Sequence, residues 1–206
     1  MAGTDSVVQI TEGSGKYLGY TVRSMASNTV YQQHVLVSEP YLPTYTVSVT
    51  TAVAVGANDH LLQIIAGPLN RVLMRRLLVT QLAGASASTK AVMQLLRLTT
   101  AGTGGTAYTP RATDPTSDTT GATARAGVSA SKGTEGNILW TGTGTYLATA
   151  ATAGATPILD LVWDDPRSQP PTIAAGTSNG LALKAITAIT TGTIHIYAEF
   201  SEAFWS

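Results

Sequence analysis

The chain has 206 residues, with twelve Lys and Arg against twelve Asp and Glu, no cysteine and only 12% charged residues. The absence of cysteine excludes disulfide-stapled scaffolds and thiolate metal sites. A charged fraction about half of the usual ~25%, with no net charge, argues against coiled coils, charged disordered tails and proteins that bind nucleic acid through a basic surface.

No apolar run approaches the ~18 residues that span a bilayer, and residues 1–10 contain neither a basic region nor an apolar block. We therefore expect a protein that remains in the cytoplasm where it is made. The composition, rich in Thr, Ala, Val and Gly, is typical of strands and turns. So little surface charge is unusual for a soluble monomer, which predicts an oligomer or an assembly.

The first segment predicts an extended arm followed by a β-hairpin. Residues 17–23 and 29–37 have strand composition and flank a short polar turn at 26–28. Because an isolated hairpin is marginal in water, it must lie on the main domain or on another chain. We expect an N-terminal anchor at 1–43, a main domain at 44–202 and a short tail at 203–206.

The next stretch predicts strands. Alternating apolar residues run from Tyr45 to Val55, and a short apolar run follows at 61–66. Residues 71–82 and 91–98 fit either a strand or a helical face, and the polar break between them could join either kind of element. We interpret the two segments as paired antiparallel strands.

A Thr- and Ala-rich segment, 99–130, predicts a long loop that is functional or covered by a partner. Strands are expected at 137–142 and 158–163, and the closing segments 180–189 and 193–200 predict a hairpin. About eight short strands without alternating helices indicate an all-β protein, an antiparallel sandwich or barrel.

The sequence offers no convincing metal or cofactor site. His34, His60 and His195 each stand alone on or beside a strand and are interpreted as half-exposed strand residues. The only acidic cluster, formed by Asp160 with Asp164 and Asp165, is interpreted as solvated turn residues next to Pro166 and Arg167, because a Ca²⁺ site needs more oxygen ligands at wider spacing.

Catalytic motifs are also missing. The glycine-rich segments 102–106 and 142–144 lack the Gly-Lys-Ser/Thr ending of a phosphate loop, so we interpret them as flexible loop. With no cysteine there is no thiol nucleophile, and we expect no enzyme. Arg71, Arg75 and Arg76 form the one basic cluster, and an interface or ion-pair role is favoured for it.

Aromatic residues gather at the two ends of the chain. We expect Tyr45 and Tyr197 to pack in the core. The aromatic residues of the arm, the hairpin and the tail have too little chain around them to be buried, so a partner surface is favoured. The candidate partner-binding residues are Tyr17, Tyr20, Arg23, Tyr31 and Trp205.

Several motifs in order along the chain resemble structural proteins of tailed bacteriophages. The motifs are Gly13-Ser14-Gly15-Lys16 with Tyr31-Gln32-Gln33-His34-Val35, Arg75-Arg76-Leu77-Leu78-Val79, Leu96-Arg97-Leu98-Thr99 before Gly104-Gly105-Thr106-Ala107-Tyr108-Thr109-Pro110 and Asp114-Pro115, and the closing 180–183 and 196–200. The resemblance implies a jelly-roll domain in the virion, trimeric and without catalysis. The Thr- and Ala-rich middle and the Phe204-Trp205 end depart from the family's pattern.

The function that follows from this resemblance is a capsid decoration or cement protein that binds across major capsid protein subunits. The fold expected is an antiparallel jelly-roll β-sandwich with an N-terminal arm and hairpin, part of a virion assembled in the host cytoplasm. One alternative is a tail- or baseplate-associated, receptor-binding jelly roll, which could contact a host-surface glycan. Another is a carbohydrate-binding module in which Trp140, Tyr146 or Trp163 stacks on sugar rings. No cofactor, nucleic acid or membrane is expected.

Overall fold

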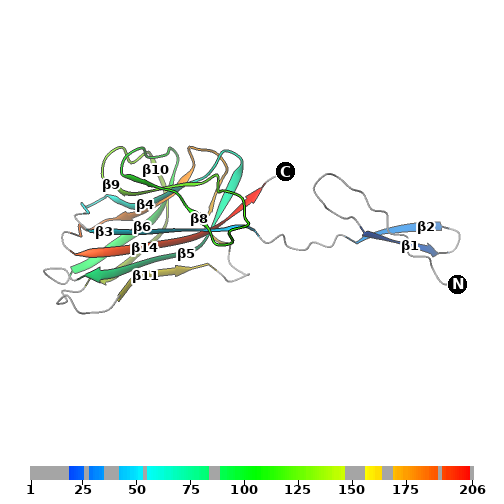
Figure 1. The fold of residues 1–206 in the computed structure, drawn as a ribbon, viewed down its shortest axis with the longest axis horizontal. Helices are drawn as coiled ribbons and strands as arrows, with labels where there is room; N and C mark the ends of the chain where they lie inside the picture. Colours follow the sequence, from blue (N-terminus) through cyan, green and yellow to red (C-terminus); the bar gives the residue numbers. More distant parts are fainter. Residues whose placement is uncertain are drawn as a thin grey trace. The chain divides into compact units, whose positions relative to one another are not determined.

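The computed structural model describes residues 19–25, 28–34, 42–52, 55–83, 89–146, 156–163, 169–189 and 192–204. Every regular element in these ranges is a β-strand (Figure 1). The chain divides into two compact units, Met1–Tyr41 and Leu42–Ser206. The fold class predicted from the sequence, an all-β antiparallel sandwich, is confirmed.

The first unit contains the predicted hairpin. Strand β1 (Gly19–Met25) pairs with β2 (Asn28–His34) in an unbroken antiparallel register from Gly19↔His34 to Met25↔Asn28. These strands form a two-stranded sheet of their own. Residues 17–18 and 35–37, which complete the predicted strands, lie outside the described residues.

The second unit consists of two antiparallel sheets. One sheet has the order β10-β6-β13-β4-β9-β7 and the other the order β11-β5-β14-β3-β8, with β12 also paired to β5. The strands are β3 (Thr44–Ala52), β4 (His60–Ile65), β5 (Asn70–Ala83), β6 (Thr89–Leu98), β7 (Thr106–Tyr108), β8 (Arg111–Ala112), β9 (Thr123–Val128), β10 (Glu135–Tyr146), β11 (Thr156–Val162), β12 (Thr172–Ile173), β13 (Gly180–Ala185) and β14 (Thr193–Phe204).

The core lies between the inner faces of the two sheets. Alternation places one side of each strand inward. On β14, for example, Ile194, Ile196, Ala198 and Phe200 are completely buried, whereas Tyr197 is half-buried. The Phe200 ring lies 5.8 Å from that of Tyr45. The largest fully buried side chains are Tyr45, Leu61, Met74, Leu77, Met93, Leu96, Ile173, Leu183, Ile189, Ile194 and Phe200.

Two predicted strand pairs are wrong. Strands β5 and β6 do not pair with each other, because β5 lies in the β14 sheet and β6 lies in the β13 sheet. In the same way, β13 and β14 lie in different sheets rather than in one hairpin. The connections cross from one sheet to the other, which lets each strand bury one face against the opposite sheet.

The predicted loop 99–130 is also wrong in part, since it contains the short strands β7, β8 and β9. Its glycines allow close packing rather than free motion. A Cβ atom on Gly104 would collide with the carbonyl oxygen of Ala130, and one on Gly102 would lie 2.5 Å from the amide oxygen of Gln63. This segment is therefore fitted closely to the sandwich. At the other end of the chain, β14 continues to Phe204, inside the segment 203–206 predicted to be a tail.

A buried carboxylate fixes this segment to β14. Glu202 is 1% exposed, and its oxygens accept hydrogen bonds from Asn70 Nδ2 at 2.9 Å, Thr120 Oγ1 at 2.5 Å, and the backbone N–H groups of Gly121 and Ala122 at 3.2 and 2.8 Å. Such bonds compensate the carboxylate for the water it has lost. Residues 120–122 are thereby held against the end of β14.

We predict that Glu202→Gln destabilises the protein by about 2 to 3 kcal/mol, because an amide NH₂ group would face N–H donors at a buried position. Urea unfolding of the two proteins measures this difference. Glu199→Gln, on the same strand and half-buried beside Tyr197, serves as the control and should change stability by less than about 1 kcal/mol. Equal effects of both substitutions would contradict the role of Glu202.

Candidate functional site

The predicted partner-binding residues fall mainly on the first unit. Tyr20 and Arg23 are on β1, and Tyr31 is on β2, where it pairs with Val22. Because positions two apart on a strand belong to one face, the positions of Tyr20, Val22 and Tyr31 share one face of the hairpin, and Arg23 belongs to the other. Tyr17 and Trp205 lie outside the described residues.

The interpretations of Asp160 and Tyr197 on the second unit are wrong. Asp160 lies in the middle of β11 rather than in a turn, and it forms a two-point ion pair with Arg76 at 2.9 and 2.8 Å. Tyr197 lies on the outer face of its sheet, where its hydroxyl donates to Glu199, rather than in the core. Asp164, Asp165 and Arg167 lie outside the described residues.

The tryptophans offered as sugar-stacking platforms are packed on the protein itself. Trp140 and Trp163 are half-buried against the hydrophobic core. The Trp163 backbone N–H donates to the Arg75 carbonyl at 2.8 Å. Nothing is described of the Tyr146 side chain.

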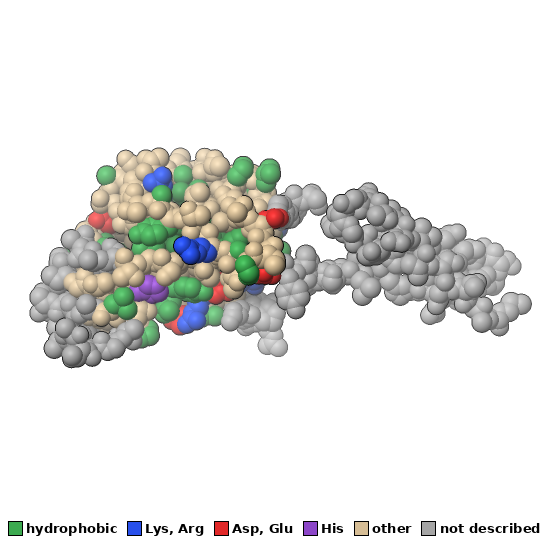
Figure 2. Space-filling view, viewed as in Figure 1, with side chains coloured by type: hydrophobic (Ala, Val, Ile, Leu, Met, Phe, Trp, Pro, Cys, Tyr) green, Lys and Arg blue, Asp and Glu red, His purple; other side chains and the backbone are tan. Residues whose placement is uncertain are grey.

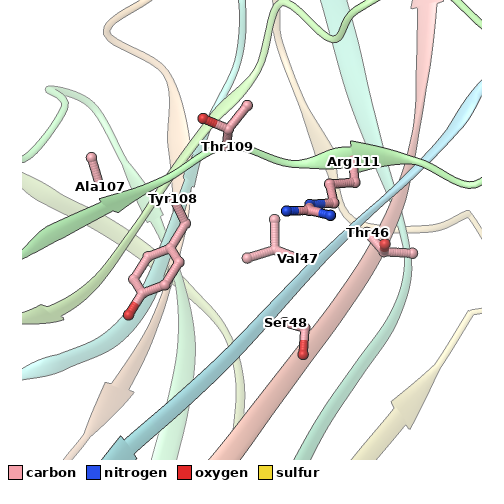
Figure 3. Close-up of a pocket in the computed structure, with 7 residues that line it drawn as sticks. All are labelled: Thr46, Val47, Ser48, Ala107, Tyr108, Thr109 and Arg111. Carbon is pink, nitrogen blue, oxygen red and sulfur yellow. The ribbon is translucent and has the colours of Figure 1, made fainter.

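A hollow of about 520 Å³ lies where the edges of the two sheets come together (Figure 3). Its wall is formed by β3, by β7 and by the crossover that carries the chain from β7 to β8. In Figure 3 the Arg111 side chain reaches back over Val47, and the Tyr108 ring lies on the other side of Val47. The lining residues are Thr46, Val47, Ser48, Ala107, Tyr108, Thr109 and Arg111.

The hollow combines one cation with hydroxyl groups and one aromatic ring. Arg111 is exposed and has no ion-pair partner among the described residues. Ser48 Oγ lies 2.7 Å from His195 Nε2. This is the distance of a nucleophile and its base, but among the described residues no carboxylate is hydrogen-bonded to His195 to orient the ring. The chemistry present favours binding of an extended polar or anionic group.

The hollow continues into an uncovered strand edge. Strand β3 pairs with β14 along its whole length, but on its other side β8 covers only Tyr45 and Thr46. The remaining part of that side, residues 47–52, has no paired strand in the described structure. We call residues 47–52 on the side away from β14 the free edge of β3.

A second polar cluster is buried under the segments that follow β6 and β9. His60 is fully buried, not half-exposed as predicted, because residues 99–105 and 129–134 cover β4. Gln63 Nε2 donates to the Lys132 carbonyl at 2.9 Å and to His60 Nδ1 at 2.6 Å. His60 Nε2 then carries the proton and donates to Glu135 at 3.0 Å. Lys184 donates to the other oxygen of Glu135 at 2.8 Å.

This arrangement requires a neutral His60. A proton on Nδ1 would face the NH₂ group of Gln63, and turning that amide would place its oxygen against the Lys132 carbonyl. Burial lowers the pKa of His60 despite the hydrogen bond with Glu135. Burial alone would raise the pKa of Glu135, but hydrogen bonds from Lys184 and His60 outweigh it, and the pKa is lowered. The cluster fastens the segment around Lys132 to β4.

No group of three or more His, Asp and Glu side chains in the described ranges could hold a metal ion. The described residues also contain no helix long and apolar enough to cross a membrane. Comparison of the chain with protein-family models, with curated proteins and with solved structures finds no match.

We predict that the free energy of unfolding decreases as the pH falls below about 6.5, the ordinary pKa of histidine. Above that pH neither the folded nor the unfolded state protonates His60, whereas below it the unfolded state binds the proton first. Urea unfolding at pH 7.5 and 5.5 measures this decrease in the free energy of unfolding, and the decrease should be smaller in His60→Gln. A loss of equal size in the His60 variant would refute this assignment.

Proposed function

We propose that the second unit is a jelly roll. In that fold the chain resembles one long hairpin whose paired strands are wrapped into two sheets. Four pairs have this nested order: β3 with β14, β4 with β13, β5 with β11 and β6 with β10. The strands β7, β8 and β9 then form an insertion between β6 and β10 that extends the edges of both sheets.

We propose further that the protein is a structural component of a tailed-bacteriophage virion, a capsid decoration protein that binds across neighbouring capsid subunits. The observation that carries this proposal is the division of the chain into a hairpin unit and a sandwich. The core residues of the sandwich all come from Tyr45 to Phe200. The hairpin strands pair only with each other in the described structure, and two strands alone are marginal in water.

A hairpin of this kind gains stability when its apolar face is covered by another surface. The face that contains the positions of Tyr20, Val22 and Tyr31 supplies two tyrosines, which are frequent anchors at protein interfaces. Many such modest contacts, repeated over a shell, add up to a stable assembly. The resemblance of several sequence motifs to those of phage structural proteins supports a capsid as the surface that is bound.

The exterior of the sandwich also suits an assembly protein. Figure 2 shows few and scattered charged side chains on the visible face of the second unit, among uncharged polar and apolar atoms. Exposed apolar side chains on this unit include Leu69, Ile138 and Val162, which are 73, 55 and 51% exposed. Weakly charged surface of this composition associates readily.

We predict that a chain without residues 1–41 keeps its far-ultraviolet spectrum and melting temperature but no longer co-sediments with empty heads of the phage that encodes it. In the full chain, Tyr20→Ser with Tyr31→Ser should weaken co-sedimentation at least about tenfold, by loss of apolar contact area. Gln32→Ser, on the opposite face of β2, is the matched control.

Attachment of the truncated chain that equals attachment of the full chain would refute the anchor. Binding of the full chain to isolated tails but not to heads would instead establish the tail-associated alternative. Binding to a glycan array that Trp163→Ala abolishes would support the carbohydrate-binding module and overturn the decoration proposal.

A further inference from the structure

The free edge of β3 exposes backbone hydrogen-bonding groups in the direction of a missing strand. The Thr44 carbonyl accepts from Thr113 N–H on the β8 side, whereas the Pro43 carbonyl accepts from Glu202 N–H on the β14 side. Backbone groups alternate sides along an antiparallel strand. Ser48 and Thr50 therefore direct their N–H and C=O groups to the free edge, where the described structure offers them no backbone partner.

This edge also lacks the features that usually prevent strands from adding. Between Thr44 and Ala52 there is no charged residue, no proline and no break in register. The other exposed edges differ: β10 has two register shifts, β11 has Pro157 and Asp160, and β7 and β8 are three and two residues long. The free edge of β3 is thus the best acceptor for an added strand in the described part of the chain.

We propose that the free edge of β3 binds residues 4–12 of a second copy of this chain as an added antiparallel strand. This inference rests on the proposed function, because it names one contact that holds the protein's own oligomer together. Segment 4–12, Thr-Asp-Ser-Val-Val-Gln-Ile-Thr-Glu, precedes the hairpin in the first unit. It is rich in β-branched residues and is followed by Gly13-Ser14-Gly15, where a strand would end.

The direction of the added strand decides which residue meets the hollow. Strand β3 runs from the hollow, at Thr46 to Ser48, toward Ala52. An antiparallel partner runs the other way, so its last residue, Glu12, arrives beside Arg111. Arg111 pairs with Thr46, so Glu12 would lie on the same face as Thr46 and Ser48, and Val8 and Ile10 would share that outer face of the sheet.

Charge and space at the hollow agree with this placement. Arg111 is exposed without an ion-pair partner in the described ranges, and a carboxylate is the group that a guanidinium binds with two parallel hydrogen bonds. The hollow of about 520 Å³ leaves room for the end of the added strand between Tyr108 and β3. Backbone pairing would supply affinity, and the Arg111 site would fix the register.

Each copy would then carry one donor segment and one acceptor edge on different parts of its surface. Contacts between unlike surfaces of identical chains are head-to-tail, and they close into a ring when the rotation permits. A small ring, such as a trimer, satisfies every donor and every acceptor. The net charge of zero adds no long-range repulsion between copies.

The test is the oligomeric state of the full chain, measured by analytical ultracentrifugation over a range of concentrations. Arg111→Glu and Glu12→Arg should each weaken association about tenfold, the effect of losing one charge-assisted hydrogen bond. The double variant, with the two charges exchanged, should recover association. Asp5→Arg, at the other end of the segment, is the matched control and should change association little. Failure of the exchanged pair to recover would overturn the proposed contact.

A second variant tests the backbone contact alone. Thr50→Pro removes an N–H that points to the free edge and leaves the ladder with β14 intact, so the melting temperature should change little. Association should fall at least about tenfold. Unchanged association of this variant, or a wild-type chain that stays monomeric at every concentration, would overturn the inference.

The two proposals fail separately. Thr50→Pro should still attach to heads through the hairpin, whereas Tyr20→Ser with Tyr31→Ser should still form the oligomer. Loss of attachment in the tyrosine variant with a normal oligomer would therefore support the proposed function without bearing on the β3 contact. An intact oligomer in Thr50→Pro would refute the β3 contact without bearing on the anchor.

Discussion

The sandwich depends on the pairing of β14 with both of its neighbours. β14, the last strand of the second unit, lies between two strands of its sheet. It pairs on one side with β3, the first strand of the unit, and on the other side with β5, the longest strand of the same sheet. Its inward residues Ile194, Ile196 and Phe200 are completely buried, and each contributes roughly 1.5 to 3 kcal/mol of hydrophobic stabilisation. Glu202 at its end fastens the inserted segment to the same strand. The core, the sheet and the inserted segment thus all depend on β14.

Strand positions could be predicted from the sequence, but strand partners could not. Alternation is a local signal, and it located β3, β4, β5 and β6 within a few residues. Pairing depends on residues far apart: Thr44 pairs with Ser201, and Asp160 with Leu78. Neighbours in sequence were assumed to be neighbours in space, which is wrong wherever a connection crosses between the sheets.

Burial of the polar side chains could not be predicted for a related reason. His60 stands in an apolar run, His-Leu-Leu-Gln-Ile-Ile, whose six residues are all buried. A strand buried on both faces must be covered on its outer side. Here the cover includes the start of the Thr- and Ala-rich segment 99–130, which the sequence predicts to be a loop that is functional or covered by a partner, and Lys132 just after it. The Thr- and Ala-rich composition of this segment marks it as unusual, but composition does not indicate which strands the segment packs against. Thr120, Gly121 and Ala122, which donate hydrogen bonds to Glu202, belong to the same segment.

Ion pairs and hydrogen bonds within the sandwich occupy several of its charged side chains, and this links the fold to the proposed assembly. Arg76 is paired with Asp160, Lys184 with Glu135, Lys132 with Asp59, and the guanidinium of Arg97 donates to the Thr172 carbonyl at 2.6 Å. With only 12% charged residues, these interactions leave few ionic groups free on the sandwich. An exterior with little free charge gives weak repulsion between copies and permits close contact at polar and apolar surfaces. Arg111 has no ion-pair partner among the described residues, and its position beside the uncovered backbone of β3 is the reason to expect an acidic strand there.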